Sequence, residues 1–153
     1  MRGFNESLLT VDEAGQRLVL RLNNRNIQDS DLLELAGLVN LKGLYLYSIP
    51  ITDTGLQALK GLVNLEGLSL YGTSVTDTGL QALKGLVNLE RLYLYGTPVT
   101  DEAIYEFLTI HPNQELTVYN ARDKGIRFSD IPEEIRAKAE QKQQTPPEIE
   151  QPV

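Results

Sequence analysis

The chain of 153 residues contains no cysteine, no tryptophan and a single histidine. The lack of cysteine excludes disulfides and cysteine-based zinc or iron–sulfur sites, and it fits a reducing compartment. The N-terminus is polar and has no apolar run of signal-peptide length, and no stretch of the sequence approaches the length of a membrane span. We therefore expect a cytoplasmic protein without a membrane anchor.

Positive charge is also scarce, because 14 lysines and arginines face 21 acidic residues and the net charge is −7. Such a balance argues against nucleic acid and against anionic membrane surfaces as partners. The single histidine, His111, precedes a proline in what we interpret as a surface turn, with no acid–base constellation around it. We expect no enzymatic activity, no cofactor, no metal site, and a monomer.

The most prominent positive feature is an internal repeat. Thr52–Glu66 reads TDTGLQALKGLVNLE, and the same letters return unchanged at Thr76–Glu90, a period of 24 residues. Laid out at this period, the sequence needs no insertion from about Asn5 to Asn120. Repeats of this length predict stacked units, because one unit cannot bury its apolar face alone.

Within each unit the hydrophobic pattern changes from that of a strand to that of a helix. Leu44–Tyr47 alternates as a half-buried strand does. Thr52 and Asp53 then supply an N-cap, and Gly61 ends a short helix. We interpret the aspartate that recurs at this position as a helix cap rather than as a metal ladder. Its copies are Asp29, Asp53, Asp77 and Asp101.

The spacing of the leucines carries a family resemblance. Leu65-x-x-Leu68-x-Leu70-x-x-Thr73-x-Val75 resembles the leucine-rich repeat pattern. The following Val-Thr-Asp-x-Gly-Leu segment is similar to the 24-residue class of bacterial repeat proteins and to the cysteine-containing repeats of F-box proteins. The resemblance covers about residues 5–120. It implies an α/β fold, a right-handed solenoid with a short parallel sheet on the concave face and short helices on the convex face, but it implies no particular partner.

One position departs from the family pattern. The ninth position often holds an asparagine whose amide bonds the turn backbone, and threonine hydroxyls can supply part of such a ladder. Other residue types occupy this position at both ends of the repeat array, so it stays open whether the ladder continues there. In this chain the position holds Arg25, Ile49, Thr73, Thr97 and Ala121.

The pattern divides the chain into four segments. We expect an N-terminal capping helix in residues 1–15, repeats in 16–120, a C-terminal loop and helix cap in 121–140, and a disordered tail in 141–153. Asn5 is the expected N-cap of the first helix. Asp130 is the expected cap of a helix over Asp130–Glu140, with Glu133 completing a capping box.

Strand geometry predicts which side chains form the concave face, since alternate residues point to opposite sides of a sheet. Six of the seven tyrosines fall there, and four of them share one column in which the rings can stack. The expected binding residues are Arg21, Tyr45, Tyr47, Ser69, Tyr71, Arg91, Tyr93, Tyr95, Thr117 and Tyr119. The column consists of Tyr47, Tyr71, Tyr95 and Tyr119.

Clustered tyrosines favour a site for a protein or peptide partner, because tyrosine supplies large, rigid, amphipathic contact area. A second interpretation is that duplication copied one strand, so that the tyrosines are inherited and only stiffen the sheet. Two other functions stay open. One is an adaptor or effector that recruits a second partner through its C-terminal helix, and the other is carbohydrate binding on the tyrosine platform.

Overall fold

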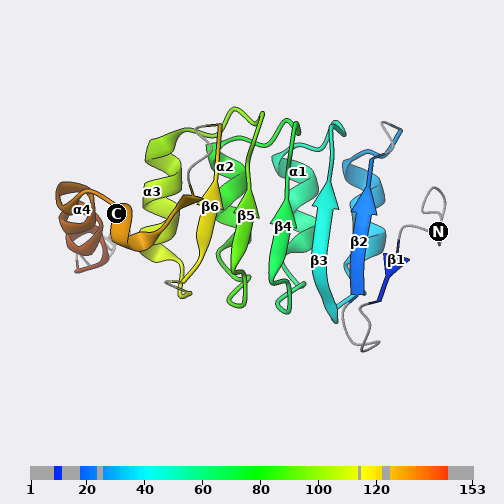
Figure 1. Cartoon of the computed structure of the whole chain (residues 1–153), viewed down its shortest axis with the longest axis horizontal. Coiled ribbons are helices and arrows are strands. Elements are labelled where there is room, and N and C mark those ends of the chain that lie inside the picture. Colours follow the sequence, from blue (N-terminus) through cyan, green and yellow to red (C-terminus); the bar gives the residue numbers. More distant parts are fainter. Residues whose placement is uncertain (1–8, 12–17, 24–25, 114, 122–124, 145–153) are drawn as a thin grey trace, which may run out of the picture.

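The computed structural model describes residues 9–11, 18–23, 26–113, 115–121 and 125–144. Its centre is a seven-stranded sheet whose strands follow one another in sequence order (Figure 1). Neighbours from β2 to β6 run parallel, whereas β1 and β7 pair antiparallel at the two edges. The strands are β1 (Leu9–Thr10), β2 (Leu18–Leu22), β3 (Leu41–Leu46), β4 (Gly67–Ser69), β5 (Arg91–Tyr93), β6 (Thr117–Tyr119) and β7 (Gly125–Ile126).

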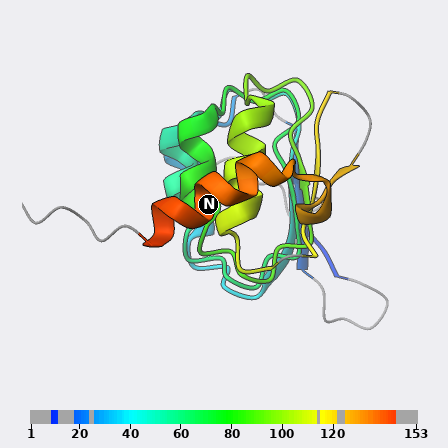
Figure 2. The ribbon, with the colours of Figure 1, turned by 90° about the vertical axis from the view of Figure 1, so that its left-hand side faces the viewer.

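The helices that connect β2 to β6 all lie on one side of the sheet, as Figure 2 shows. This arrangement confirms the expected α/β fold with a mostly parallel sheet. Most of these helices are single turns, and only the last is a regular α-helix of ten residues. They are η2 (Asp29–Leu35), α1 (Asp53–Leu56), η3 (Gln57–Leu59), α2 (Asp77–Leu80), η4 (Gln81–Leu83) and α3 (Asp101–Ile110). After β7 follow η5 (Phe128–Asp130) and α4 (Glu133–Gln144).

The repeated leucines form one continuous core between the sheet and the helices. Leu44 and Leu46 of β3 and Leu56 and Leu59 of the following helical turns are fully buried. Their counterparts in the next unit are equally buried and join the same cluster. Each such side chain contributes roughly 1.5–3 kcal/mol through its removal from water. Stacked units therefore bury the apolar face that one unit would expose.

The aspartate column links neighbouring repeats, which corrects the expectation that each aspartate caps its own helix. Thr52 is the N-cap of α1, and its Oγ1 accepts a hydrogen bond from the backbone N–H of Thr54 at 3.2 Å. The carboxylate of Asp53 instead accepts the backbone N–H of Thr76, one repeat further on, at 2.7 Å, and also the hydroxyl of Thr76. The same pair of bonds joins Asp29 to Thr52 and Asp77 to Thr100.

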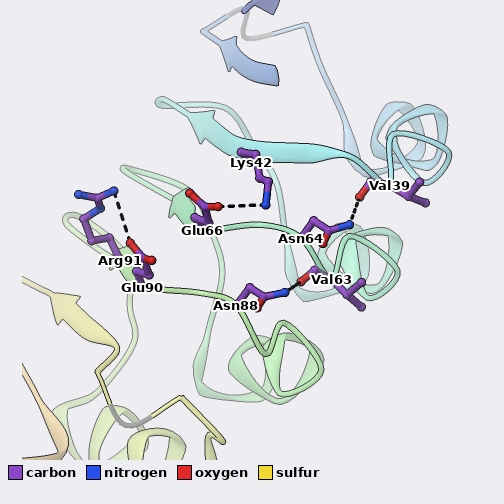
Figure 3. Close-up of polar contacts among 8 residues, drawn as sticks. All are labelled: Val39, Lys42, Val63, Asn64, Glu66, Asn88, Glu90 and Arg91. Carbon is purple, nitrogen blue, oxygen red and sulfur yellow. Dashed lines mark hydrogen bonds and ion pairs between the residues drawn. The ribbon is translucent and has the colours of Figure 1, made fainter. Parts of the chain in front are cut away.

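A second ladder joins the loops that follow the helices (Figure 3). The side-chain amide of Asn64 donates to the carbonyl of Val39 at 2.8 Å, and that of Asn88 donates to the carbonyl of Val63 at 2.8 Å. Asn113 continues the series with a bond to the carbonyl of Leu89. Each amide satisfies a loop carbonyl of the preceding unit, so these asparagines tie the repeats together along this edge.

The ninth position of the repeat contributes less than the family pattern implies. The hydroxyls of Thr73 and Thr97 donate to the carbonyls of Leu70 and Leu94, three residues earlier in their own repeats, at 2.8 and 2.7 Å. Ile49 at the equivalent position is buried in the core. The threonines therefore close turns within a repeat, whereas the asparagine ladder lies elsewhere in the unit.

At the N-terminal edge the expected capping helix is wrong for the part that the structure describes. Leu9 and Thr10 form β1, which pairs antiparallel with Leu20 and Val19 of β2. An added strand satisfies backbone N–H and C=O groups along the edge of a sheet. Asn5 and Gly15, the expected ends of that helix, lie outside the described residues.

The C-terminal segment also differs from expectation. Gly125 and Ile126 form β7 on the edge of β6, where a loop was predicted. Helix α4 begins at Glu133, after Pro132, and continues to Gln144, so it includes the first four residues of the expected tail. Asp130 lies in η5, where its carboxylate accepts the backbone N–H of Arg127 at 3.0 Å. The remainder of the predicted tail, residues 145–153, lies outside the described residues.

The last repeat is two residues longer than the others, so the expectation of an uninterrupted register is wrong. Leu44 pairs with Leu68 at the usual spacing of 24, whereas Leu92 pairs with Val118, at a spacing of 26. The extra length accompanies the longer helix α3 (Asp101–Ile110), which replaces the two short helical turns of the preceding units. An even insertion keeps each side chain on its side of the sheet.

Candidate binding face

The tyrosine face is the side of the sheet opposite the connecting helices, and it carries the six tyrosines with Arg21, Ser69, Arg91 and Thr117. Strand pairing arranges these residues in rows across the sheet. Arg21, Tyr45, Ser69, Tyr93 and Tyr119 form the central row, one residue from each of five neighbouring strands. Because the leucines between them point into the core, the central row must point away from it.

Three tyrosines of the expected column lie one or two residues beyond the C-terminal ends of β3, β4 and β5, against one another. The ring centroids of Tyr47 and Tyr71 are 6.4 Å apart, and those of Tyr71 and Tyr95 are 6.5 Å apart. The rings are tilted by 53° and 43°, so they meet obliquely rather than as a parallel stack. Tyr47 and Tyr71 remain 38% and 48% exposed, which leaves their rings accessible.

The fourth tyrosine of the column, Tyr119, lies in a different row from the one predicted. The two additional residues in the last repeat bring it opposite Tyr93, where the rings stack at 4.8 Å with only 12° between their planes. Gly125 on β7 makes room on the other side, since a Cβ there would lie 3.1 Å from the Tyr119 ring. Tyr119 is therefore packed between β5 and β7 and extends the central row.

Tyr45 lies across two glycines of the sheet. A Cβ at Gly43 would lie 3.1 Å from its ring, and one at Gly67 would lie 3.3 Å from its hydroxyl oxygen. The guanidinium carbon of Arg21 is 5.1 Å from the ring centroid, and Tyr47 stacks on it at 6.3 Å. The space that the two glycines open is therefore filled by Tyr45 itself.

The centre of the tyrosine face is hollowed at Ser69. This small side chain stands in the central row between Tyr45 and Tyr93, whose rings rise on either side. The hollow has a volume of about 290 Å³. Ser69 is only 3% exposed, so it forms the floor. The hollow is lined by Tyr45, Tyr47, Ser69, Tyr71, Tyr93 and Tyr95.

Tyr93 of this cluster keeps its proton at neutral pH. Burial raises the pKa of the Tyr93 phenol above its usual value of 10.0, and the neighbouring Tyr119 phenol adds to the effect. The positive charge of Arg91 opposes this rise in pKa. Tyr93 thus presents a neutral hydroxyl to the hollow, and this group can both donate and accept hydrogen bonds.

The structure adds one residue to the face that the sequence placed in a loop. Arg127 directly follows β7, and its Nε donates to the Thr117 hydroxyl at 3.3 Å. Thr117 is in turn the strand partner of Arg91. Arg91 and Arg127 therefore flank Thr117 from opposite sides. The sequence offered no strand signal for Gly125–Ile126 beyond a single isoleucine, so neither β7 nor the position of Arg127 was predicted.

His111 is not the surface turn residue that the sequence suggested. It is 3% exposed at the end of α3, with its ring centroid 5.1 Å from that of Phe107. Its Nδ1 accepts the backbone N–H of Asn113 at 3.2 Å. Burial lowers the pKa of His111 below its usual value of 6.5, while the backbone of Asn113 and of Leu86 opposes that shift in pKa. His111 is thus a neutral core residue at neutral pH.

Metal-binding clusters and membrane-spanning helices are both absent from the described residues. Within the described ranges, no three histidine, aspartate or glutamate side chains gather closely enough to hold a metal ion. None of the helices that the structure describes combines the length and the apolar character needed to cross a membrane.

The fold and the face define the class of protein: an α/β repeat protein whose sheet carries an aromatic surface opposite its helices. No protein-family model matches the chain. No curated protein matches it either.

Two solved structures of internalins from Listeria monocytogenes str. 4b F2365 resemble the chain. Internalin C2 (inlC2) is 33% identical, with a TM-score of 0.46, over 55% of this chain and 33% of the internalin chain. Internalin inlF is 25% identical, with a TM-score of 0.48, over 69% of this chain and 27% of the internalin chain. The chain thus spans a third or less of the length of either internalin.

Proposed function

We propose that the chain is a leucine-rich-repeat protein that binds a peptide or protein surface on its tyrosine face without catalysing a reaction. In this proposal the stacked units form a right-handed solenoid with the tyrosine face on its concave side. The observation that carries it is the gathering of five of the seven tyrosines around one hollow, on the side of the sheet away from the connecting helices. Exposed tyrosines supply binding energy at low cost in side-chain entropy.

The differences between repeats support binding over inheritance alone. The scaffold segment Thr52–Glu66 returns unchanged at Thr76–Glu90, yet the strands between these segments differ. The central row holds Ser69 between Tyr45 and Tyr93, and this difference creates the hollow. A ladder that served only to stiffen the sheet would not need a gap at its centre.

Removal of the three tyrosines whose rings meet at an angle tests the proposal. The variant combines Tyr47→Ala, Tyr71→Ala and Tyr95→Ala, at positions just beyond the C-terminal ends of β3, β4 and β5. The matched control combines Val39→Ala, Val63→Ala and Val87→Ala, which remove apolar side chains that are 49%, 42% and 47% exposed in the loops after the helices. Both sets keep the repeat spacing and shorten side chains that are exposed or, for Tyr95, half-buried.

Partners captured on the immobilised chain are purified and titrated against all three proteins by calorimetry. We expect the tyrosine variant to lose at least about 2 kcal/mol of binding free energy, as the loss of hot-spot residues does. The valine variant should bind as the unchanged chain does. A partner whose affinity survives the tyrosine substitutions would contradict binding on this face.

A second candidate function is an adaptor, and one further hollow favours it. A cavity of about 630 Å³ lies where α3 and α4 meet, with Ile110, Ile135 and Ala139 among its lining residues. A second partner held there would be recruited beside the first. Ala139→Arg fills this cavity without touching the tyrosine face. An adaptor would then lose one of two partners, whereas a simple binding module would lose none.

Carbohydrate binding is the remaining alternative, because sugar rings also stack on tyrosine. A glycan array probed with the unchanged chain and with the triple tyrosine variant tests it. Binding of a glycan by the first protein and not by the second would favour this function over peptide binding. The cytoplasmic location and the monomeric state stay predictions, and light scattering on the purified chain measures the second.

A further inference from the structure

Basic side chains gather at one end of the tyrosine face, although the chain as a whole has a net charge of −7. Arg91 and Arg127 both lie beside Thr117, one as its strand partner and one through its hydrogen bond. Both arginine side chains are exposed. Among the described residues, the one carboxylate within 4 Å of either guanidinium is that of Glu90, which lies 3.8 Å from Arg91 Nη2.

The contacts of these two arginines leave most of their donors available. A guanidinium carries five N–H donors in a planar fork that matches a carboxylate. Arg127 bonds Thr117 through its Nε alone, so this contact does not use its two terminal nitrogens. The ion pair of Arg91 with Glu90 is long and half exposed, and such pairs contribute little. An incoming carboxylate can therefore engage both groups.

The distance between this basic pair and the hollow fixes the spacing of a ligand. Ser69 lies on β4, and Thr117 lies on β6, two strands further along the same sheet. Adjacent strands are about 4.8 Å apart, so the two positions are roughly 10 Å apart across the strands. Thr117 also lies two residues before Tyr119, the residue in the row of Ser69, so the offset along the strands is about 7 Å and the total distance is about 12 Å. An extended peptide, which advances about 3.3 Å per residue, would span this distance with three to four residues.

We propose that the tyrosine face recognises an acidic peptide segment, with an apolar side chain in the hollow above Ser69 and carboxylates, three to four residues away, on Arg91 and Arg127. This inference rests on the proposed function and adds the chemistry of the partner. Arg21, at the opposite end of the central row beside Tyr45, provides a comparison, because it is cationic and shares the face but lies on the other side of the hollow.

Two blocked hexapeptides test the inference on the full chain. The first has leucine at its second position, glutamate at its fifth and sixth, and serine elsewhere, and the second has glutamine in place of glutamate. Titrations into ¹⁵N-labelled protein are followed by NMR at low ionic strength, where screening is weak. We expect the glutamate peptide to bind about three- to tenfold more tightly and to shift the resonances of the central row, as two partly exposed ion pairs would produce.

Arginine substitutions then test whether Arg91 and Arg127 favour the glutamate peptide specifically, or whether any positive charge on the face does. Arg91→Gln and Arg127→Gln should each weaken binding of the glutamate peptide about two- to fivefold. Together they should remove its advantage over the glutamine peptide. Arg21→Gln should change the advantage by less than twofold. An equal loss from Arg21→Gln would mean that charge acts over the whole face, and it would overturn the assignment to the pair.

The remaining outcomes distinguish a failure of this inference from a failure of the proposed function on which it rests. Equal binding of both peptides, with shifts on the tyrosine face, would overturn the acidic preference and leave peptide binding at this face supported. Absence of shifts on the tyrosine face with the glutamate peptide up to about 5 mM, a concentration that detects even millimolar affinity, would also overturn the inference. The triple tyrosine variant and its captured partner decide the proposed function separately.

Discussion

Asp53 accepts the backbone N–H of Thr76, 23 residues later, at 2.7 Å, and it accepts the hydroxyl of the same threonine. The relationship joins the first residue of helix α1 to the N-cap of helix α2. It explains why aspartate recurs once in every repeat although a different residue, the threonine, caps the helix. The bonds recur at Asp29 and Asp77, so they form a chain of contacts through the stack.

Asp53→Ala should lower the free energy of unfolding by about 1–3 kcal/mol, because it leaves the backbone N–H of Thr76 without this acceptor. Asp53→Asn keeps one carbonyl oxygen and should cost less. Urea denaturation followed by circular dichroism measures both values. Glu34→Ala, at an exposed position, serves as the control and should change stability by less than about 0.5 kcal/mol. A loss no larger for Asp53→Ala than for this control would contradict the importance of the ladder.

Gly79→Ala should destabilise the chain because its backbone lies against the same aspartate. A Cβ at Gly79 would lie 2.3 Å from Asp53 Oδ1 and 2.8 Å from Val75 Cγ1. Relief of such overlap displaces the helix or breaks the bonds of Asp53, at a cost of about 1–3 kcal/mol. Thermal and urea unfolding measure the difference.

Gly61→Ala is the matched control, since a Cβ there would meet nothing within 4 Å. Its φ angle is not positive, so alanine can adopt it, and we expect no loss or a gain of up to about 1 kcal/mol. The combination of Asp53→Ala with Gly79→Ala should cost less than the sum of the two, because each change affects the same contact. Strict additivity would show that the close approach carries no energy.

Ser48→Gly should stabilise the chain. Ser48 has a φ of 51°, in the left-handed region, whereas the same position in the next two repeats is Gly72 at 63° and Gly96 at 68°. A residue with a side chain costs roughly 1–2 kcal/mol in this region. We therefore expect a gain of about 1 kcal/mol in the free energy of unfolding, measured by urea denaturation. A loss of stability would show that the Ser48 hydroxyl makes a contact worth more than the strain.

The sequence predicted those features that depend on period alone. The 24-residue repeat located the strands, the buried leucines and the side of the sheet on which each tyrosine lies, since side-chain alternation survives any even shift. It failed where the period changes. The longer helix α3 shifts Tyr119 by two residues, into the row of Tyr93. The pattern of the earlier repeats could not predict this shift.

The predictions for the two ends of the sheet were wrong for a different reason. A pattern of apolar residues reports burial, but β1 and β7 are two-residue strands held by backbone pairing at the edges of the sheet. Backbone bonds leave no signature in side-chain spacing. Arg127 lies on the face only because β7 pairs with the edge of the sheet. The repeat pattern therefore could not predict the basic end of the candidate site.

His111, the single histidine of the chain, should make the free energy of unfolding depend on pH below about 6.5. Its pKa is lowered from 6.5 by burial, so below pH 6.5 the unfolded chain binds more protons than the folded one. Stability should therefore be full above about pH 6.5 and fall as the pH drops toward the folded pKa. Urea midpoints measured across this window, for the unchanged chain and for His111→Leu, isolate the contribution. An NMR titration of the ring proton with a midpoint at or above 6.5 would contradict the burial-driven shift, because a buried imidazole against Phe107 must resist protonation.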